Sequence, residues 1–192
     1  MLTTELLLFA YRQGIFPMAD DEGAIGWYSP VRRGLIPLDD RFHIPHGLRR
    51  ALKKSPFEVS VDRDFDAVVR ACATLHGKTW ISEEIRQAYC QLHREGYAHS
   101  IEARLAGKLA GGLYGVHLGG AFFGESMFYR VPDASKVALV SLVERLRERG
   151  FLLLDAQWTT PHLASFGTFE VSHGHYLRLL KKALSLNCEF DG

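Results

Sequence analysis

The spacing of hydrophobic and polar residues predicts alternating helices and strands along the chain. Residues 3–13 have apolar side chains at helical spacing between a threonine and a glycine, which are typical start and stop signals of a helix. Residues 25–38 have the pattern of short strands interrupted by prolines, which favours the edge of a sheet. Further elements are expected in this order: a helix from Pro45 to about Lys54, a strand over 57–61, a helix from Asp64 to about Ala73 and a helix from Ser82 to Gly96.

From His99 the pattern changes to longer strands joined by glycine turns. The expected elements are an antiparallel meander over 100–105, 109–118 and 121–130, a helix from Asp133 to Gly150, a strand over 151–158, a short helix from Pro161, a strand over 168–171 and a helix from Ser172. We predict a mixed α/β fold of the α+β class. A smaller N-terminal α/β domain over residues 1–80 is expected to pack on a second domain over 81–192.

Polar residues interrupt two of the strands that should be buried. Glu125 lies within the apolar run 119–129, and Asp155 and Gln157 lie at the end of the run 151–158. A buried charge is costly unless donors or a cation meet it, so these strands indicate a pocket with apolar walls and a polar floor. Structural carboxylates paired with Arg or Lys elsewhere are the alternative. Gly124 predicts a β-bulge or a close backbone approach just before Glu125.

Composition limits the class of protein. The 192 residues are 47% hydrophobic and 23% charged, with a net charge of +1, so a globular core is possible and no global field attracts nucleic acids or membranes. Positive charge is concentrated locally, because Arg49 with Lys53 and Arg50 with Lys54 stack at four-residue spacing on one expected helix. This cluster indicates either a solvated helix face or a contact with a phosphate backbone.

Cysteines and histidines give no sign of a disulfide framework or a metal site. The three scattered cysteines favour a reducing cytoplasm. No apolar run is long enough to cross a bilayer, and no leader segment opens the chain. Histidines at positions 43/46 and 173/175 are closely spaced, but no Cys or carboxylate completes a ligand set. We expect a cytoplasmic monomer with no membrane contact, metal or other cofactor.

The order of hairpin, central strand, helix and strand is similar to the acyltransferase fold of the GCN5-related N-acetyltransferase superfamily. That resemblance implies a glycine-rich loop for the coenzyme A pyrophosphate at residues 130–136. The segment has neither glycine, and Pro132 removes a backbone donor, so a different acyl donor is expected.

A more detailed resemblance covers nearly the whole chain. The segments that carry it are residues 10–17, 27–30, 79–81, 99–102, 111–116, 123–128, 134–136, 155–157 and 162–165, and they include Gly124-Glu125-Ser126 and Asp155-Ala156-Gln157. Together they resemble the leucyl/phenylalanyl-tRNA–protein transferase family. The resemblance implies an aminoacyltransferase that moves Leu or Phe, and Met less well, from aminoacyl-tRNA to proteins that begin with Arg or Lys, which marks them for degradation by the N-degron pathway.

The same resemblance implies roles for individual residues. Asp155 and Gln157 handle the N-terminus of the acceptor, and Glu125 lies in the same pocket. Trp80 lies beside the terminal adenosine of the tRNA. The other implied substrate-binding residues are Leu113, Phe122, Met127, Leu142, Leu146 and Ser135, and those implied to bind tRNA are Arg49, Arg50, Lys53 and Lys54.

The chain also departs from the family pattern. Met18 stands where the family usually has Trp, Thr160 stands where Asn is common, and the family's N-terminal extension is nearly absent. Lys136 follows Ser135 in the first turn of a helix and is a candidate to meet a phosphate.

The chemistry fits the absence of a convincing nucleophile triad, because an aminoacyl ester is already activated. Positioning of the two substrates can be worth roughly 7–11 kcal/mol. Our hypothesis is that Asp155 neutralises the incoming cation and orients Gln157, which steers the amine. A coenzyme A-dependent N-acyltransferase and a non-catalytic tRNA- or peptide-binding module are the alternatives.

Overall fold

A computed structural model describes residues 2–53, 56–75, 77 and 79–191. Along the chain the elements are α1 (Thr4–Arg12), β1 (Phe16–Ala19), β2 (Ile25–Tyr28), β3 (Arg32–Ile36), α2 (His46–Lys53), β4 (Phe57–Val61), α3 (Phe65–Thr74), α4 (Glu83–Arg94), β5 (Ala98–Leu105), β6 (Lys108–Leu118), β7 (Ala121–Tyr129), α5 (Ala134–Glu148), β8 (Leu153–Gln157), α6 (Pro161–Ala164), β9 (Phe169–Ser172) and α7 (His173–Leu184). The order of helices and strands follows the hydrophobic pattern closely.

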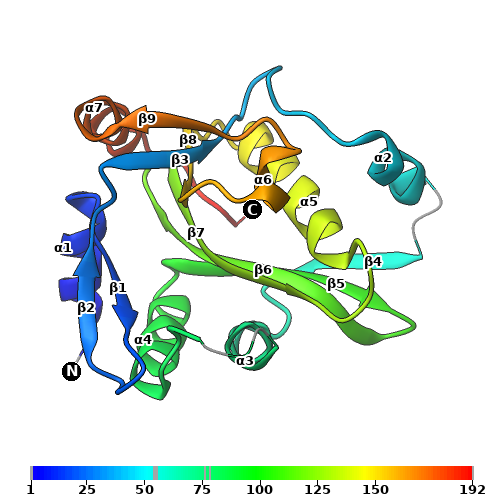
Figure 1. Ribbon diagram of the computed structural model, residues 1–192, viewed down its shortest axis with the longest axis horizontal. Coiled ribbons are helices and arrows are strands. Elements are labelled where there is room, and N and C mark those ends of the chain that lie inside the picture. The colour runs from blue at the N-terminus through cyan, green and yellow to red at the C-terminus, as the bar shows by residue number, and fades with distance from the viewer. Residues whose placement is uncertain (1, 54–55, 76, 78, 192) are drawn as a thin grey trace.

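One large sheet organises the molecule, with strand order β4-β5-β6-β7-β8-β3-β9. Strands β5, β6 and β7 form the expected antiparallel meander, and among the strand pairs of the described residues only β7–β8 is parallel. Helix α5 covers one face of the meander, and α3 and α4 cover the other (Figure 1). The mixed α/β fold is therefore confirmed, and its sheet is mostly antiparallel.

Hydrophobic side chains on the two faces form separate core clusters. Helices α1, α3, α4 and α7 bury residues such as Leu7, Val68 and Tyr176 in one cluster. Helix α5 buries its leucine and valine stripe in the other cluster, against residues such as Ile101 of β5. Burial on both faces explains why the central strands are apolar almost throughout.

Helix starts follow the sequence signals, with one exception. The side chains of Thr3 and Ser82 each accept the backbone N–H three residues further on. Asp133, expected to cap α5, has a φ of +68° and makes no side-chain cap bond. Its carboxylate accepts a hydrogen bond from Nζ of Lys136 at 3.0 Å instead. The left-handed backbone therefore leaves α5 without the expected side-chain cap.

The two predicted edge strands behave differently. Strand β2 pairs with β1 in a separate two-stranded sheet, as expected of an edge, whereas β3 lies between β8 and β9. Pro30 and Pro37 lie just outside β3, so it loses no hydrogen-bond donor and can occupy an interior position. The division at residue 80 stays a prediction, although β3 and β4 pair in the same sheet as the later strands.

The parallel pair of β7 and β8 is short, and the sheet opens beyond it. Phe123 opposite Asp155 is the last paired position. At that point each strand has an extra residue relative to its antiparallel neighbour: Glu125 in β7 and Ala156 in β8. Bulges bend a strand and redirect its side chains, so the sheet opens at the polar residues. The bulge predicted from Gly124 is confirmed.

Candidate functional site

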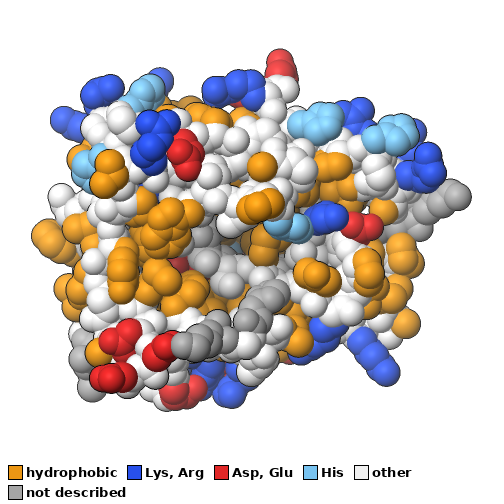
Figure 2. Space-filling model, in the orientation of Figure 1, with side chains coloured by type: hydrophobic (Ala, Val, Ile, Leu, Met, Phe, Trp, Pro, Cys, Tyr) orange, Lys and Arg blue, Asp and Glu red, His pale blue; other side chains and the backbone are white. Residues whose placement is uncertain are grey.

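A cavity of about 550 Å³ lies where β7 and β8 separate. Most of its walls are apolar, and the space-filling view shows the surface hollowed between hydrophobic side chains (Figure 2). Its lining residues come from β3, β6, β7, α5, β8, α6 and the β8–α6 loop, and they are Ile36, Leu113, Tyr114, Gly124, Glu125, Ser126, Met127, Tyr129, Ser135, Leu139, Leu142, Leu154, Asp155, Ala156, Trp158, Thr160, His162 and Leu163. The predicted pocket with apolar walls and carboxylates is therefore present.

Most of the expected wall residues line this cavity. Leu113, Met127, Leu142 and Ser135 do so, whereas Phe122 and Leu146 do not. The cavity lining therefore does not support a substrate-binding role for those two, which stays a prediction. Phe122 pairs with Leu154 where β7 and β8 are still joined, and its ring packs against Phe190 at 5.3 Å. Leu146 lies one turn further along α5 than Leu142, and like Phe122 it is fully buried in the core.

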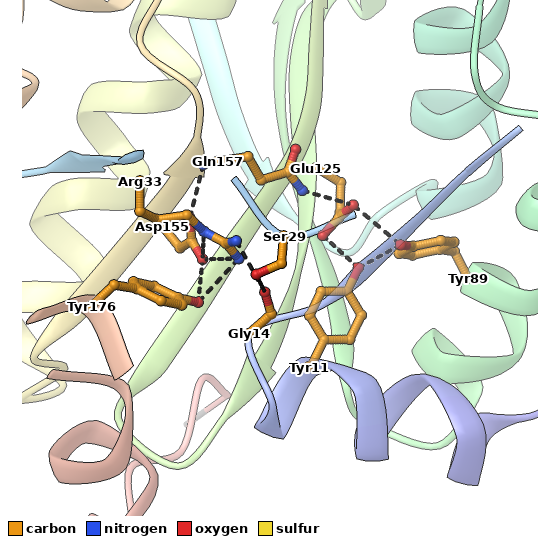
Figure 3. A network of polar contacts seen from close by, with 9 residues as sticks. All are labelled: Tyr11, Gly14, Ser29, Arg33, Tyr89, Glu125, Asp155, Gln157 and Tyr176. Carbon is orange, nitrogen blue, oxygen red and sulfur yellow. Dashed lines mark hydrogen bonds and ion pairs between the residues drawn. The ribbon is translucent and has the colours of Figure 1, made fainter. Parts of the chain in front are cut away.

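Glu125 forms the centre of a buried hydrogen-bond network (Figure 3). Its carboxylate accepts hydrogen bonds from the hydroxyls of Tyr11 at 2.6 Å and Tyr89 at 3.1 Å, and from Nε2 of Gln157 at 3.4 Å. The two tyrosine hydroxyls also contact each other. Burial raises the pKa of Glu125 to about 7, even though the tyrosine hydrogen bonds favour its charged form. Such a group exists in both protonation states near neutral pH.

Asp155 is the second buried carboxylate, and its charge is already compensated. Arg33 donates from Nε to both carboxylate oxygens at 3.0 Å and from Nη2 to Oδ2 at 2.9 Å. The hydroxyl of Tyr176 donates at 2.6 Å, and the backbone N–H of Gln157 donates at 2.8 Å. Direct neutralisation of an incoming cation by Asp155 therefore does not fit this geometry, because both of its oxygens are occupied inside the protein.

Gln157 is held in an unusual backbone conformation at the edge of the opening. Its φ is +64°, a region that residues with side chains rarely adopt. The bond from its N–H to Asp155 helps to fix that conformation. Figure 3 shows the amide nitrogen pointing to Glu125 and the amide oxygen pointing away from it. Local strain of this kind is common at functional sites, where the surrounding structure stabilises it.

The remaining expected residues lie away from the cavity lining. Trp80 is half-buried against the core, and its carbonyl accepts a hydrogen bond from the N–H of Ala19 at 3.0 Å. Arg49, Arg50 and Lys53 are exposed on α2. The fourth basic residue predicted there, Lys54, lies outside the described residues.

Met18 and Thr160, the two residues that depart from the family pattern, both have defined contacts. Met18 is half-buried in the β1–β2 hairpin and packs against the core. Thr160 lines the cavity and caps α6, because its Oγ1 accepts the N–H of Leu163 at 3.3 Å. A capping role needs only a short side chain with an acceptor oxygen, which Thr and Asn both offer.

Four buried residues that the sequence did not predict as part of the site hold it together. They are Arg33, Tyr11, Tyr89 and Tyr176, all buried. Arg33 also donates from Nη1 to the carbonyl of Gly14 at 3.0 Å, so it connects β3 to the loop after α1. Tyr11 and Gly14 lie in one of the segments that carry the family resemblance, which is the one signal that pointed to this region.

A possible metal-ligand group lies elsewhere, away from the cavity lining. Asp62, His99 and Asp191 place ligand atoms within 4.8 Å of one another. The Asp62 carboxylate already pairs with Nδ1 of His99 at 2.7 Å and accepts the N–H of Ser100 at 2.7 Å. Internal hydrogen bonds account for this arrangement. Within the described part of the chain, none of the helices combines the length and the apolar character that crossing a bilayer requires.

The fold and the site define a class of mixed α/β proteins that enclose a mainly apolar cavity above a buried carboxyl–amide pair. Comparison with protein families then gives a specific match. The model described as leucyl/phenylalanyl-tRNA protein transferase matches residues 35–181, and the model of the N-terminal domain of that transferase matches residues 1–31. The chain belongs to the leucyl/phenylalanyl-tRNA–protein transferase family.

Individual relatives agree over nearly full length. The leucyl/phenylalanyl-tRNA–protein transferase of Akkermansia muciniphila is 60% identical over 95% of this chain and 96% of its own length. That of Rubrobacter xylanophilus is 55% identical over 98% of both chains. Among solved structures, the C-terminal domain of a putative lysylphosphatidylglycerol synthetase from Agrobacterium fabrum is 12% identical with a TM-score of 0.46, over 94% of this chain and 57% of that one. A likeness at this level carries no argument about function.

Proposed function

We propose that this protein transfers Leu or Phe, and Met less well, from aminoacyl-tRNA to the α-amine of proteins that begin with Arg or Lys, and so marks them for degradation. The observation that supports this function most directly is the apolar cavity lined by Glu125, to which Gln157 donates a hydrogen bond, in a chain of this family. No cofactor enters the scheme, because the ester of the aminoacyl-tRNA is already activated.

The cavity receives the side chain of the donor amino acid. Its volume of about 550 Å³ is within the usual range for small-ligand sites, and Leu113, Met127 and Leu142 supply apolar contacts. Ser135 lies on the same wall and contributes a polar contact to the donor. An apolar slot separates side chains that differ by one methylene by only about 1–3 kcal/mol, so Leu, Phe and Met overlap as donors, whereas β-branched donors clash at their first side-chain carbon.

The reaction forms a bond between the acceptor nitrogen and the ester carbonyl carbon and breaks the bond from that carbon to the ribose oxygen. The amine must lose a proton, and the ribose oxygen must gain one. Gln157 orients the amine through its amide oxygen, while Glu125 holds the amide nitrogen. Glutamine is a weak base, so water carries the proton. Asp155 acts as a positioning residue, because it fixes the backbone of Gln157 rather than meeting the substrate.

The tRNA body contacts a surface outside the cavity. We assign Arg49, Arg50 and Lys53, exposed on α2, to its phosphate backbone, together with Lys54 from the same segment. Trp80 is assigned to the terminal adenosine. Strands β5 to β8 with α5 form the part that we relate to the GCN5-related N-acetyltransferase fold, because the parallel β7–β8 pair opens at its end. We place the protein in the cytoplasm as a monomer, where aminoacyl-tRNA is available.

A transfer assay with the purified protein tests this function. Labelled Leu-tRNA or Phe-tRNA is incubated with peptides that differ only in a first residue of Arg, Lys or Ala, and transfer to the Arg and Lys peptides is expected. Binding of tRNA without transfer to any peptide supports a non-catalytic binding module instead. Protection from thermal unfolding by acetyl-CoA supports the coenzyme A-dependent alternative.

A further inference from the structure

The geometry of the site leaves the cationic side chain of the acceptor without its expected partner. Asp155 is fully buried and paired with Arg33. Glu125 is 7% exposed, and its carboxylate accepts hydrogen bonds from three neighbouring side chains. We propose that the indole ring of Trp158 binds the cationic side chain of the acceptor's first residue. This inference rests on the proposed transfer reaction and names the group that selects Arg and Lys.

Trp158 has the position that such a role requires. It follows Gln157 directly, lines the cavity and is 43% exposed. The first residue of the acceptor carries both the reacting α-amine and the cationic side chain. When Gln157 holds the amine, the side chain of that same residue extends from a point next to Trp158. A large aromatic side chain left half-exposed at the mouth of a cavity is also a typical ligand contact.

The backbone of Trp158 is fixed tightly against β3. A Cβ atom added to Gly34 would lie 2.6 Å from the carbonyl carbon of Trp158 and 2.7 Å from the nitrogen of Thr159. Only glycine permits that close approach. The N–H of Trp158 donates to the carbonyl of Ala156 at 2.7 Å, which completes a tight turn after the bulge. The backbone that carries the indole ring is therefore fixed relative to Gln157.

The indole ring keeps an open face for a ligand. Its contact with Phe16 is T-shaped, with ring centroids 5.2 Å apart and planes at 89°. In such a pair one ring meets the other edge-on, so Phe16 covers at most one face of Trp158. Phe16 itself is fully buried and holds the indole in place. Because Trp158 is exposed and lines the cavity, a cation can reach a face that Phe16 leaves open.

The charges around Trp158 permit a cationic ligand. The two arginines of β3 each pair with a carboxylate: Arg33 with Asp155, and Arg32 with Glu170 at 3.0 Å. The quadrupole of an indole ring attracts both ammonium and guanidinium groups and requires no fixed hydrogen-bond geometry. One ring can therefore accept Lys and Arg alike, whereas a neutral side chain gains only ordinary apolar contact.

The experiment compares an Arg-started peptide with the same peptide started by citrulline, which has the shape of Arg without its charge. The quantity measured is the ratio of the two kcat/KM values at fixed aminoacyl-tRNA. In Trp158→Leu we expect this ratio to fall about 5- to 10-fold, as the loss of one cation–π contact implies. In Trp158→Phe the ratio should fall less, because a weaker aromatic face remains. If citrulline peptide is not transferred measurably, its inhibition constant replaces its kcat/KM.

Trp27→Leu is the matched control. Trp27 is 41% exposed in β2, where it lies opposite Pro17, and it does not line the cavity. The ratio should keep its wild-type value in this variant. Equal melting temperatures of the variants exclude a folding defect, and the Phe variant carries the test if the Leu variant is unstable.

The possible outcomes separate this inference from the proposed function. An unchanged ratio in Trp158→Leu overturns the role of Trp158 while transfer itself continues. A higher KM for aminoacyl-tRNA with an unchanged ratio also overturns it, since the ring would then stack on a nucleobase. Absence of transfer by the wild-type protein to any Arg- or Lys-started peptide contradicts the proposed function instead.

Discussion

Gln157 is the side chain on which the transfer step is expected to depend most directly. Its backbone has a φ of +64°, and its amide nitrogen donates to Glu125 at 3.4 Å. Gln157→Ala removes the amide oxygen that orients the amine, so kcat should fall by about 100-fold or more. Steady-state transfer assays measure this, and the KM for aminoacyl-tRNA should stay close to the wild-type value. A variant that keeps its wild-type kcat would remove Gln157 from the mechanism.

Glu125 should make the stability of the protein depend on pH. Burial raises its pKa from the ordinary 4.5 to about 7. Between these values the folded protein holds a proton that the unfolded chain releases, so the free energy of unfolding falls as pH rises through this window. The loss is about 3 kcal/mol once the pH exceeds 7. Glu125→Gln does not titrate, so urea unfolding should show its stability relative to wild type increasing by about that amount between pH 5 and 8.

If the difference in the free energy of unfolding between Glu125→Gln and wild type stays constant over this pH range, the raised pKa of Glu125 is contradicted. The pH dependence of the transfer rate should also reflect the protonation of Glu125. The titration of the acceptor's α-amine is common to both proteins, so the ratio of their kcat/KM values isolates the contribution of Glu125.

Arg33 and its neighbour Arg32 provide an internal comparison of a buried and an exposed ion pair. Arg33 is 1% exposed and pairs with a buried carboxylate, whereas Arg32 pairs with Glu170 at the surface. Arg33→Met leaves Asp155 charged and unpaired, so the free energy of unfolding should fall by about 3–5 kcal/mol. Arg32→Met, the same change one residue earlier, should cost no more than about 1 kcal/mol.

The double variant Arg33→Met with Asp155→Asn tests whether the charge explains the loss. Removal of both charges should restore much of the stability that Arg33→Met loses, because no unpaired carboxylate remains buried. It should not restore transfer, since the hydrogen bonds that hold Gln157 are altered. Denaturant unfolding and the transfer assay give the two readouts, and equal stability of the single and double variants would contradict this account.

The placement of strands and helices was largely predictable, because most elements form from local patterns. Period-two alternation in residues 57–61 and the leucine stripe of residues 133–150 gave the right elements. Glu125 and Asp155 were found because charges are unusual in apolar strands. Arg33 could not be found in this way. It is 122 positions from Asp155 along the chain, and no local pattern records which strand will lie beside β8.

Strand β3 shows why neighbouring elements had to be seen in three dimensions. The prolines around it indicated an edge, yet it occupies an interior place and brings Gly34 against the backbone of Trp158. The family resemblance implied that Phe122 and Leu146 bind the substrate, but neither lines the cavity. Phe122 lies where β7 and β8 are still paired, Leu146 is buried in the core, and sequence alone does not show where the pair opens.

The close contact between β3 and the segment after β8 makes a prediction about a single glycine. A Cβ atom at Gly34 would lie 2.6 Å from the backbone of Trp158, so Gly34→Ala forces the two segments apart. The expected loss in the free energy of unfolding is about 1–3 kcal/mol. Gly47→Ala in α2 is the control, because no atom of the described residues lies within 4 Å of its added Cβ. This change should stabilise the protein by about 0.5–1 kcal/mol.

Thermal unfolding of both glycine variants separates a steric effect from a general effect of alanine. If Gly34→Ala and Gly47→Ala shift the melting temperature in the same direction, the close approach of β3 is not a constraint. Transfer should also decline in Gly34→Ala, because the displaced segment carries Gln157 and Trp158.

Considered as a whole, the molecule has too little net charge to attract tRNA by its global field. The net charge is +1, so the attraction must come from a local cluster. Arg49, Arg50 and Lys53 are exposed together on α2, outside the cavity lining, and are the candidates. Replacement of all three by Ala should weaken tRNA binding and make it less dependent on salt. Each lost phosphate contact should reduce the slope of log K against log salt by about 0.7–0.9.

A second helix supplies a control of equal charge. Arg178, Lys181 and Lys182 are exposed on α7, and their replacement by Ala changes the net charge by the same amount. If α2 contacts the tRNA backbone, only the α2 variant should reduce the salt slope, measured by titration at several salt concentrations. Equal effects of the two variants would mean that total charge, rather than the position of α2, governs binding. Because neither triplet lines the cavity, kcat at saturating tRNA should be unchanged in both variants, which separates recognition of the tRNA from the transfer step.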